Sequence, residues 1–92
     1  MLFATELHRL REEKQLLQRQ IAAVLEIDTP MYSKIERGDR RAKRCQVITI
    51  ADYLHTDKER LLTLWLADQV TEIVKEDKNL ATDVFKTALN VL

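Results

Sequence analysis

Apolar residues recur three or four positions apart in one segment of the chain after another, which is the spacing of amphipathic helices. The predicted helices cover residues 5–14, 18–25, 29–37 and 43–54, a fifth begins at about Asp57, and a last one runs from about Leu80 to Leu92. The chain also has only one Gly and one Pro and is rich in residues that favour helices. The sequence therefore predicts an all-α fold.

Local side chains indicate where several of these helices begin and end. Thr5 is expected to cap the first helix, and Thr56 with Glu59 forms a capping-box pattern at the start of the fifth. Pro30 fits the first turn of the third helix, because its missing N–H would have no intrahelical partner there. Gly38 fits the left-handed conformation that ends a helix. The third helix is therefore expected to be short, about two and a half turns.

The predicted fifth helix is apolar on two sides. One stripe comprises Leu61, Leu64 and Trp65, and the other comprises Leu62, Leu66, Val70, Ile73 and Val74. Because such a helix needs two partners, we expect one side to pack on the preceding helices and the other on the final segment or on a second subunit. The residues expected to mediate dimerisation are Leu62, Trp65, Leu66, Val70, Ile73 and Phe85.

Several classes of protein are disfavoured by what the sequence lacks. No apolar run approaches the roughly 20 residues that cross a bilayer, and Cys45 has no second cysteine with which to form a disulfide. His8 and His55 lie far apart, without other ligands at metal-binding spacing. No glycine-rich phosphate loop or Ser/His/Asp arrangement occurs. We expect a cytoplasmic protein that is not an enzyme, with no metal, no cofactor, no membrane partner and no evident small-molecule ligand.

Charge is unevenly distributed although the net charge is zero. Residues 1–44 carry ten Lys/Arg and seven Asp/Glu, whereas residues 45–92 carry five and eight. The segment from Lys34 to Arg44 contains six basic residues and only two acidic ones. A basic run alone is most often a solvated surface, and it indicates a nucleic-acid-binding surface only together with a motif that itself predicts one.

Several separated motifs have the order and spacing of one known family. They are Leu10–Lys14, Gln18, Ile21 with Ala22, Ser33–Gly38, and Ile50-Ala51 with Leu54. Over roughly residues 5–66 the chain resembles the XRE/Cro family of helix-turn-helix repressors, which includes the lambdoid phage repressors. It is similar to small stand-alone members such as the controllers that accompany restriction–modification genes. The resemblance implies a five-helix lambda-repressor-like bundle over residues 1–66, and residues 67–92 then form a C-terminal helical extension for dimerisation.

The resemblance also implies which residues contact DNA. The third helix would enter the major groove, and Lys34 is the strongest candidate for reading a base because its ammonium can donate to guanine O6 and N7. The positions that match DNA contacts of the family are Gln18, Thr29, Pro30, Ser33, Lys34, Arg37, Arg40, Arg41 and Lys43. Three positions depart from the family pattern: Leu17 replaces the Thr that caps the second helix, Glu26 replaces a Gly of the turn, and Pro30 removes a donor from the recognition surface.

Two functions remain open at this point. The first is a transcriptional regulator that binds double-stranded DNA as a homodimer, on a palindromic operator whose half-sites lie about 34 Å apart. The alternative is a protein-interaction or antitoxin-like adaptor that uses its apolar C-terminal helices, which the neutral net charge modestly favours. The two differ in salt dependence, because phosphate contacts weaken steeply as salt rises.

Overall fold

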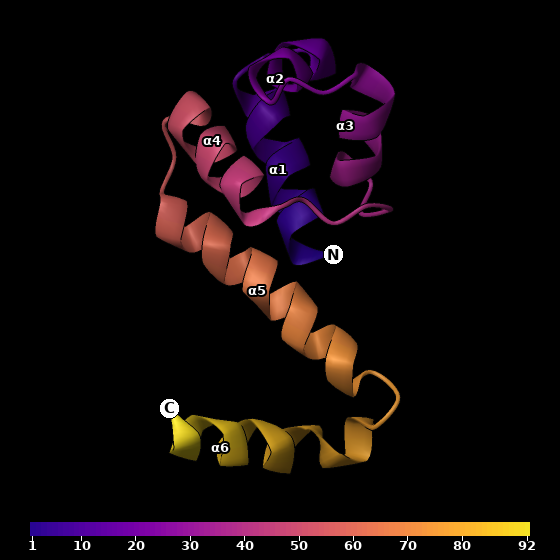
Figure 1. Cartoon of the computed structure of the whole chain (residues 1–92), viewed down its shortest axis with the longest axis vertical. Coiled ribbons are helices and arrows are strands. Elements are labelled where there is room, and N and C mark those ends of the chain that lie inside the picture. The colour runs from indigo at the N-terminus through magenta and orange to yellow at the C-terminus, as the bar shows by residue number, and fades with distance from the viewer.

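A computed structural model describes residues 1–92 and consists of helices joined by short loops, without strands (Figure 1). The elements are α1 (Leu2–Glu13), α2 (Gln18–Val24), α3 (Thr29–Glu36), α4 (Arg44–Leu54), α5 (Lys58–Val74), a 3-10 turn (Lys78–Leu80) and α6 (Ala81–Val91). The predicted all-α fold is confirmed. The molecule measures 42 × 23 × 22 Å, and its long axis follows α5 away from the other helices to α6 at the far end.

One hydrophobic core joins α1 to α4 and the first turns of α5. The largest fully buried side chains are Tyr32, Leu7, Ile21, Ile35, Ile50, Leu54, Leu61 and Val47. They come from all five helices and lie on the apolar stripes that the sequence predicts. Burying each such aliphatic or aromatic side chain contributes about 1.5–3 kcal/mol, so the shared core fixes how the short helices are oriented relative to one another.

The first helix begins earlier than the sequence predicts, and its cap comes from a distant residue. The expectation that Thr5 caps it is wrong, because α1 already begins at Leu2. The Asp68 carboxylate on α5 accepts the Leu2 N–H at 2.7 Å and the Phe3 N–H at 2.9 Å. Packing of α1 against α5 brings this carboxylate to amide groups that would otherwise lack a partner. The cap therefore depends on tertiary structure.

The start of α5 and the end of α3 follow local signals more closely. At α5 the cap is Asp57 rather than Thr56, since the Asp57 carboxylate accepts the Glu59 N–H at 2.9 Å. Gly38 adopts the predicted left-handed conformation after α3, with φ of 82°. A Cβ atom at Gly38 would also lie 2.8 Å from Cγ of Met1, so both backbone and space favour glycine there.

The C-terminal part of the chain is built differently. The predicted boundary between residues 66 and 67 falls inside α5, which continues without a break to Val74. The final helix is confirmed as α6, but it has no buried residue and packs mainly against the 3-10 turn before it. No helix combines the length and apolar character that crossing a membrane would need.

Candidate nucleic-acid interface

The second and third helices form a compact helix-turn-helix unit. The chain leaves α2 through Glu26, which takes a left-handed conformation with φ of 58°, and the Ile27 N–H bonds to the Ala22 carbonyl at 3.1 Å. Asp28 then caps α3 by accepting the Met31 N–H at 2.8 Å. Glu26 therefore takes the left-handed conformation at the position where the family that the sequence resembles has Gly. For a non-glycine residue this conformation costs roughly 1–2 kcal/mol.

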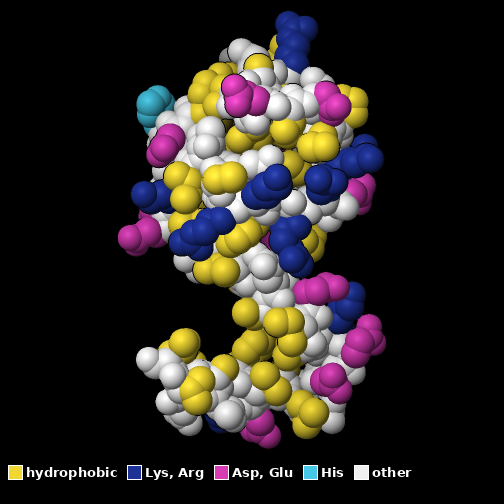
Figure 2. Space-filling model, viewed as in Figure 1, with side chains coloured by type: hydrophobic (Ala, Val, Ile, Leu, Met, Phe, Trp, Pro, Cys, Tyr) yellow, Lys and Arg dark blue, Asp and Glu magenta, His cyan; other side chains and the backbone are white.

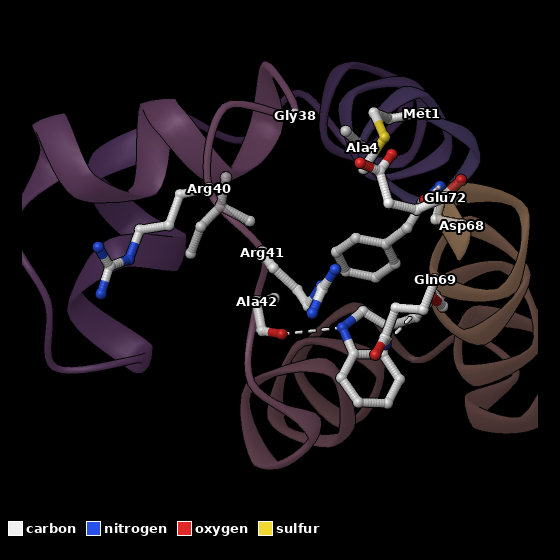
Figure 3. A pocket seen from close by; sticks show the side chains of 12 residues that line it. Met1, Ala4, Gly38, Arg40, Arg41, Ala42, Asp68, Gln69 and Glu72 are labelled. Atoms are coloured by element: carbon white, nitrogen blue, oxygen red, sulfur yellow. Dashed lines mark hydrogen bonds between the residues drawn. The ribbon is translucent and has the colours of Figure 1, made fainter. Parts of the chain in front are cut away.

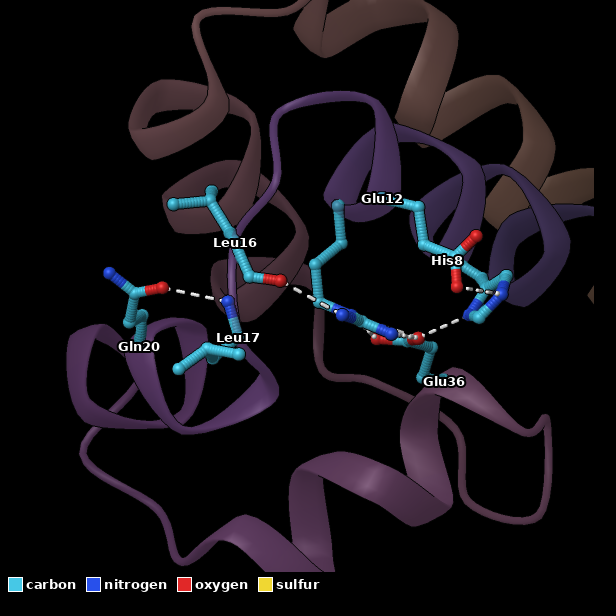
Figure 4. A network of polar contacts seen from close by, with 7 residues as sticks. His8, Glu12, Leu16, Leu17, Gln20 and Glu36 are labelled. Carbon is cyan, nitrogen blue, oxygen red and sulfur yellow. Dashed lines mark hydrogen bonds and ion pairs between the residues drawn. The ribbon is translucent and has the colours of Figure 1, made fainter.

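The start of α2 has no capping Thr and is stabilised by a different hydrogen bond. The Leu17 side chain cannot accept a hydrogen bond, but the Leu17 backbone N–H donates to Oε1 of Gln20 at 2.7 Å (Figure 4). This is half of a capping box, in which a side chain inside the helix reaches back to the residue before it. Gln18, a predicted DNA contact, is the half-buried first residue of α2.

A buried ion pair fixes the end of α3 against α1. The Arg11 guanidinium donates to Glu36 from Nε at 2.9 Å and from Nη2 at 2.8 Å, and its Nη1 donates to the Leu16 carbonyl at 2.9 Å (Figure 4). The side chain of Glu36 is only 2% exposed. His8 also contacts the Glu36 carboxylate through Nδ1. These contacts hold the C-terminal end of α3 and leave its other side free.

Glu36 stays ionised in this buried position. Burial raises the pKa of its carboxyl, but hydrogen bonds from its neighbours, led by Arg11, outweigh burial and lower the pKa to about 2. Hydrogen bonding to Glu36 likewise raises the pKa of Arg11. The pair is therefore fully charged at neutral pH and anchors α3 electrostatically.

The outer side of α3 carries most of the predicted DNA contacts. Thr29, Pro30, Lys34 and Arg37 are exposed and Ser33 is half-buried, whereas the opposite side of the helix, with Tyr32, Ile35 and Glu36, is buried. Because Pro30, Lys34 and Arg37 follow each other at intervals of four and three residues, they share one surface of the helix. The structure thus brings these predicted residues together.

Basic side chains continue from α3 into the loop before α4. The Lys34 carbonyl accepts the Asp39 N–H at 2.9 Å and the Arg40 N–H at 3.3 Å, which ties the loop to the end of α3. Arg37 pairs with Asp39 at 3.2 Å. Between residues 34 and 44, the cations without an acidic partner are Lys34, Arg40, Arg41, Lys43 and Arg44. In Figure 2, dark blue side chains form a band across the lower part of the bundle, where Figure 1 shows this loop.

The two neighbouring arginines of this loop point in different directions. Arg41 points into a hollow of about 240 Å³ between α1, the loop and α5, toward Gln69, whereas Arg40 points away from it (Figure 3). Asp68 and Glu72 also line this hollow. The Arg40 side chain can therefore contact a ligand that binds on the α3 side of the loop. The Arg41 side chain would have to rotate out of the hollow to reach the same ligand.

The predicted dimerisation residues fall into two groups. Leu62 and Trp65 are half-buried against the core of their own subunit, and the Trp65 indole N–H donates to the Ala42 carbonyl at 2.8 Å. The others are exposed: Leu66 by 46%, Val70 by 45%, Ile73 by 77% and Phe85 by 36%. The apolar surface that remains available is therefore farther toward the C-terminus than the sequence indicates.

Two residues that the structure brings to attention are missing from the sequence-based list of sites. Arg44 is the exposed first residue of α4 and adds one more unpaired cation to those of the loop. It is the last residue of the basic run that begins at Lys34, so the sequence did contain a signal for it. Asp68 caps α1 across more than 60 residues of sequence. No local pattern around Asp68 could have shown that role.

Comparison with known proteins identifies one family. A helix-turn-helix domain family matches residues 2–64, which cover α1 to α4 and the first part of α5. No curated protein and no solved structure matches the chain. The matched range contains all the candidate DNA contacts and ends before the exposed apolar residues of α5.

Proposed function

This chain belongs to the helix-turn-helix domain family, and we propose that it is a transcriptional regulator of the XRE/Cro type that binds a specific sequence of double-stranded DNA. The observation that carries the proposal is the outer side of α3, where exposed Thr29, Pro30 and Lys34 lie next to unpaired cations of the following loop. The helix behind this surface is fixed by the Arg11–Glu36 pair. A positioned helix with a polar outer side is what reading a major groove requires.

The dimensions and chemistry of α3 agree with this role. A helix of eight residues is about 12 Å long and can lie in a major groove about 12 Å wide. Lys34 would donate to guanine O6 and N7, while Pro30 and Met31 offer apolar contact to a thymine methyl group. Ser33, Arg37, Arg40 and the residues beyond would contact phosphates and so supply affinity rather than specificity.

We further propose that the protein acts as a homodimer on a palindromic operator. Exposed Leu66, Val70 and Ile73 on α5, together with α6, supply an apolar surface outside the DNA-binding bundle. A two-fold axis through this surface would present two α3 helices to half-sites about 34 Å apart. Residues 67–92 then serve as a dimerisation extension.

One observation also favours the adaptor as a second candidate function. The apolar residues of α6 are all at least partly exposed, and a surface of this kind can bind a different polypeptide. Its affinity would depend little on salt, whereas DNA affinity carried by several Lys and Arg side chains falls steeply as salt rises. Salt dependence therefore separates the two functions.

The deciding experiment selects duplex DNA from a randomised pool and titrates the selected site against a scrambled one at two salt concentrations. We compare the wild type with Lys34→Ala and with the control Lys86→Ala, which removes an exposed lysine from α6. We expect a palindromic site, and a loss of discrimination of about 5- to 150-fold in Lys34→Ala only. Equal binding of all sequences would overturn the proposal.

The two loop arginines provide a sharper test of the surface. Arg40→Ala should lower affinity for selected and scrambled DNA alike and reduce the salt slope by about one. Arg41→Ala should have the smaller effect, because its side chain points into the hollow beside α5. A larger effect of Arg41→Ala would place the DNA on the α5 side of the loop instead.

A further inference from the structure

The loop between α3 and α4 is tied to the neighbouring helices at its two ends. At the first end, the Lys34 carbonyl accepts the Arg40 N–H at 3.3 Å. At the other end, the Lys43 carbonyl accepts two N–H groups of α4, at 3.0 and 3.1 Å. Arg41 and Ala42 lie between these ends and make no hydrogen bond to another backbone group. The middle of the loop must therefore be held by side chains.

One residue of α5 supplies that contact. The Trp65 indole N–H donates to the Ala42 carbonyl at 2.8 Å, and Figure 3 shows this bond as a dashed line. It is the only hydrogen bond that the backbone of Arg41 and Ala42 makes. The Ala42 residue is also buried in the core and is 3% exposed. One hydrogen bond and one methyl group thus fix the middle of the loop to α5.

The bonded carbonyl lies among cations that have no acidic partner. Arg41 directly precedes Ala42, Lys43 directly follows it, and Arg40 is one residue farther away. Without the indole N–H, the Ala42 carbonyl would be buried with no hydrogen-bond partner, unless the loop moved outward and exposed it to water. Because the three cations belong to the same short stretch, such a movement would displace all of them.

The helix that carries Trp65 is itself firmly held at this point. Leu61, one turn before Trp65, lies in the core and is 1% exposed. Asp68, almost one turn after it, accepts the first two N–H groups of α1. The indole is therefore presented from a fixed helix, and the loop is the part that would move if the hydrogen bond were lost.

We propose that Trp65 is a positioning residue for DNA binding, because its hydrogen bond to Ala42 orders the loop cations before DNA arrives. The inference rests on the DNA binding proposed above and adds a residue that does not itself touch DNA. Ordering a mobile loop at an interface costs free energy, so a loop that is ordered beforehand binds more tightly. Phosphate contacts are independent of base sequence. Trp65 should therefore raise affinity for every duplex alike and leave discrimination to α3.

A double-mutant cycle tests whether Trp65 acts through the loop cations. Trp65→Phe keeps an aromatic ring and removes the N–H donor, and fluorescent DNA makes the titration independent of the tryptophan. We expect affinity for selected and scrambled duplexes to fall by about 3- to 10-fold, the effect of losing one hydrogen bond. In a chain with Arg40→Ala, Arg41→Ala and Lys43→Ala, the same change should lower affinity by less than about 1.5-fold, because no loop cation remains to be positioned. Both chains are titrated at the same low salt concentration.

Two controls separate positioning from packing. Leu64→Val trims a half-buried side chain of the same helix and removes no hydrogen bond, so it should leave DNA affinity unchanged. If Trp65→Phe does not fold, as judged by circular dichroism, 3-benzothienylalanine is placed at position 65 instead. Its ring system keeps the size of indole and has sulfur in place of the N–H group. The expected fold-changes are the same.

Two outcomes would overturn the inference. Unchanged affinity of Trp65→Phe with the wild-type loop would show that burial of Ala42 alone orders the loop. Equal losses in both loop backgrounds would show that Trp65 contributes packing only. Either result leaves the proposed function intact if the wild type prefers the selected duplex. A wild type without that preference refutes the proposed function, and the cycle on scrambled DNA still tests the positioning role of Trp65.

Discussion

The bundle and the C-terminal hook, which we define as residues 66–74 of α5 and residues 81–91 of α6, contain similar apolar stripes but bury them to very different extents. Of the 16 buried residues, 15 lie at or before Leu61, and only Val74 lies beyond it. Of the 12 exposed large hydrophobic residues, nine lie at Leu66 or later. Helical periodicity is equally clear in both regions, so the difference lies in whether a partner helix is present in the same chain. The bundle is complete by itself, whereas the hook needs an additional surface.

The two regions also differ in their ionic contacts. The bundle contains the Arg11–Glu36 pair, in which the two side chains are 13% and 2% exposed. The hook region contains only the pair between Glu72 and Lys75, whose side chains are 54% exposed at Lys75 and 53% at Glu72. Water screens the second pair but not the first. One substitution of the same type in each region therefore tests how far the two regions differ.

The largest effect is expected when the bundle loses its buried carboxylate. Glu36→Gln should lower the free energy of unfolding by about 3–5 kcal/mol, because it leaves the Arg11 guanidinium buried without a counterion. The matched change Glu72→Gln should cost less than about 1 kcal/mol, since its pair is exposed. Urea unfolding measured at a single protein concentration compares the two. Similar costs would mean that Arg11–Glu36 is not the anchor of α3.

If Glu36→Gln does not fold, a double variant keeps the question open to measurement. Replacing both partners, as in Arg11→Met with Glu36→Leu, removes the two charges together and should restore much of the stability. A double variant no more stable than Glu36→Gln would show that the packing of these side chains, rather than their charges, holds the helices together.

Acid should weaken the bundle through the same carboxylate. The pKa of Glu36 is about 2 in the folded protein, below its ordinary value of 4.5. The resulting stability is present above pH 4.5 and is lost as the pH falls from there toward 2. The loss is about 3 kcal/mol, measured as the free energy of urea unfolding at successive pH values. The slope should be smaller in the double variant without this pair, and an equal slope would assign acid sensitivity to other carboxylates.

Dilution should affect the hook and leave the bundle intact. Because α6 has no buried residue within its own chain, it should lose its helix below the dimer dissociation constant, and the loss should be confined to about its 11 residues. Far-ultraviolet circular dichroism measured over a concentration series would show the decrease, while the Trp65 fluorescence of the bundle stays constant. A helix content that does not depend on concentration would mean that α6 is stable without a partner.

The sequence predicts the bundle well because its information is local. Apolar periodicity located every helix, and Gly38 marked the end of α3 through its left-handed conformation. Helix starts were less predictable. Thr56 and Asp57 are both capping residues, and the choice between them depends on which backbone amides each can reach. At α1 the capping carboxylate comes from Asp68, which tertiary packing alone brings there.

The candidate site was predictable in its residues but not in their directions. The residues that the family resemblance marks as DNA contacts on α3 lie on its exposed side, and their contact with DNA stays a prediction. Adjacent Arg40 and Arg41 look equivalent in the sequence, yet they point to opposite sides of the loop. The apolar stripe of α5 likewise did not reveal that Trp65 donates to Ala42 within its own subunit. Side-chain direction in a loop and partner choice on a two-sided helix both depend on the assembled bundle.

The smallest effect is expected from a hydroxyl inside the bundle. The Tyr32 side chain is fully buried and its hydroxyl makes no hydrogen bond in the structure, and burial together with the nearby Glu36 carboxylate raises the pKa of that hydroxyl. Tyr32→Phe keeps the ring and removes the unpaired polar group, so the free energy of unfolding should stay within about 0.5 kcal/mol of the wild type or rise slightly. Urea unfolding at neutral pH measures the change, and Tyr53→Phe, at a half-buried position of α4, is the control. A loss of more than about 1 kcal/mol for Tyr32→Phe alone would show that the hydroxyl makes a hydrogen bond to the neighbouring Glu36 in solution, and the Arg11–Glu36 anchor would then include a third member.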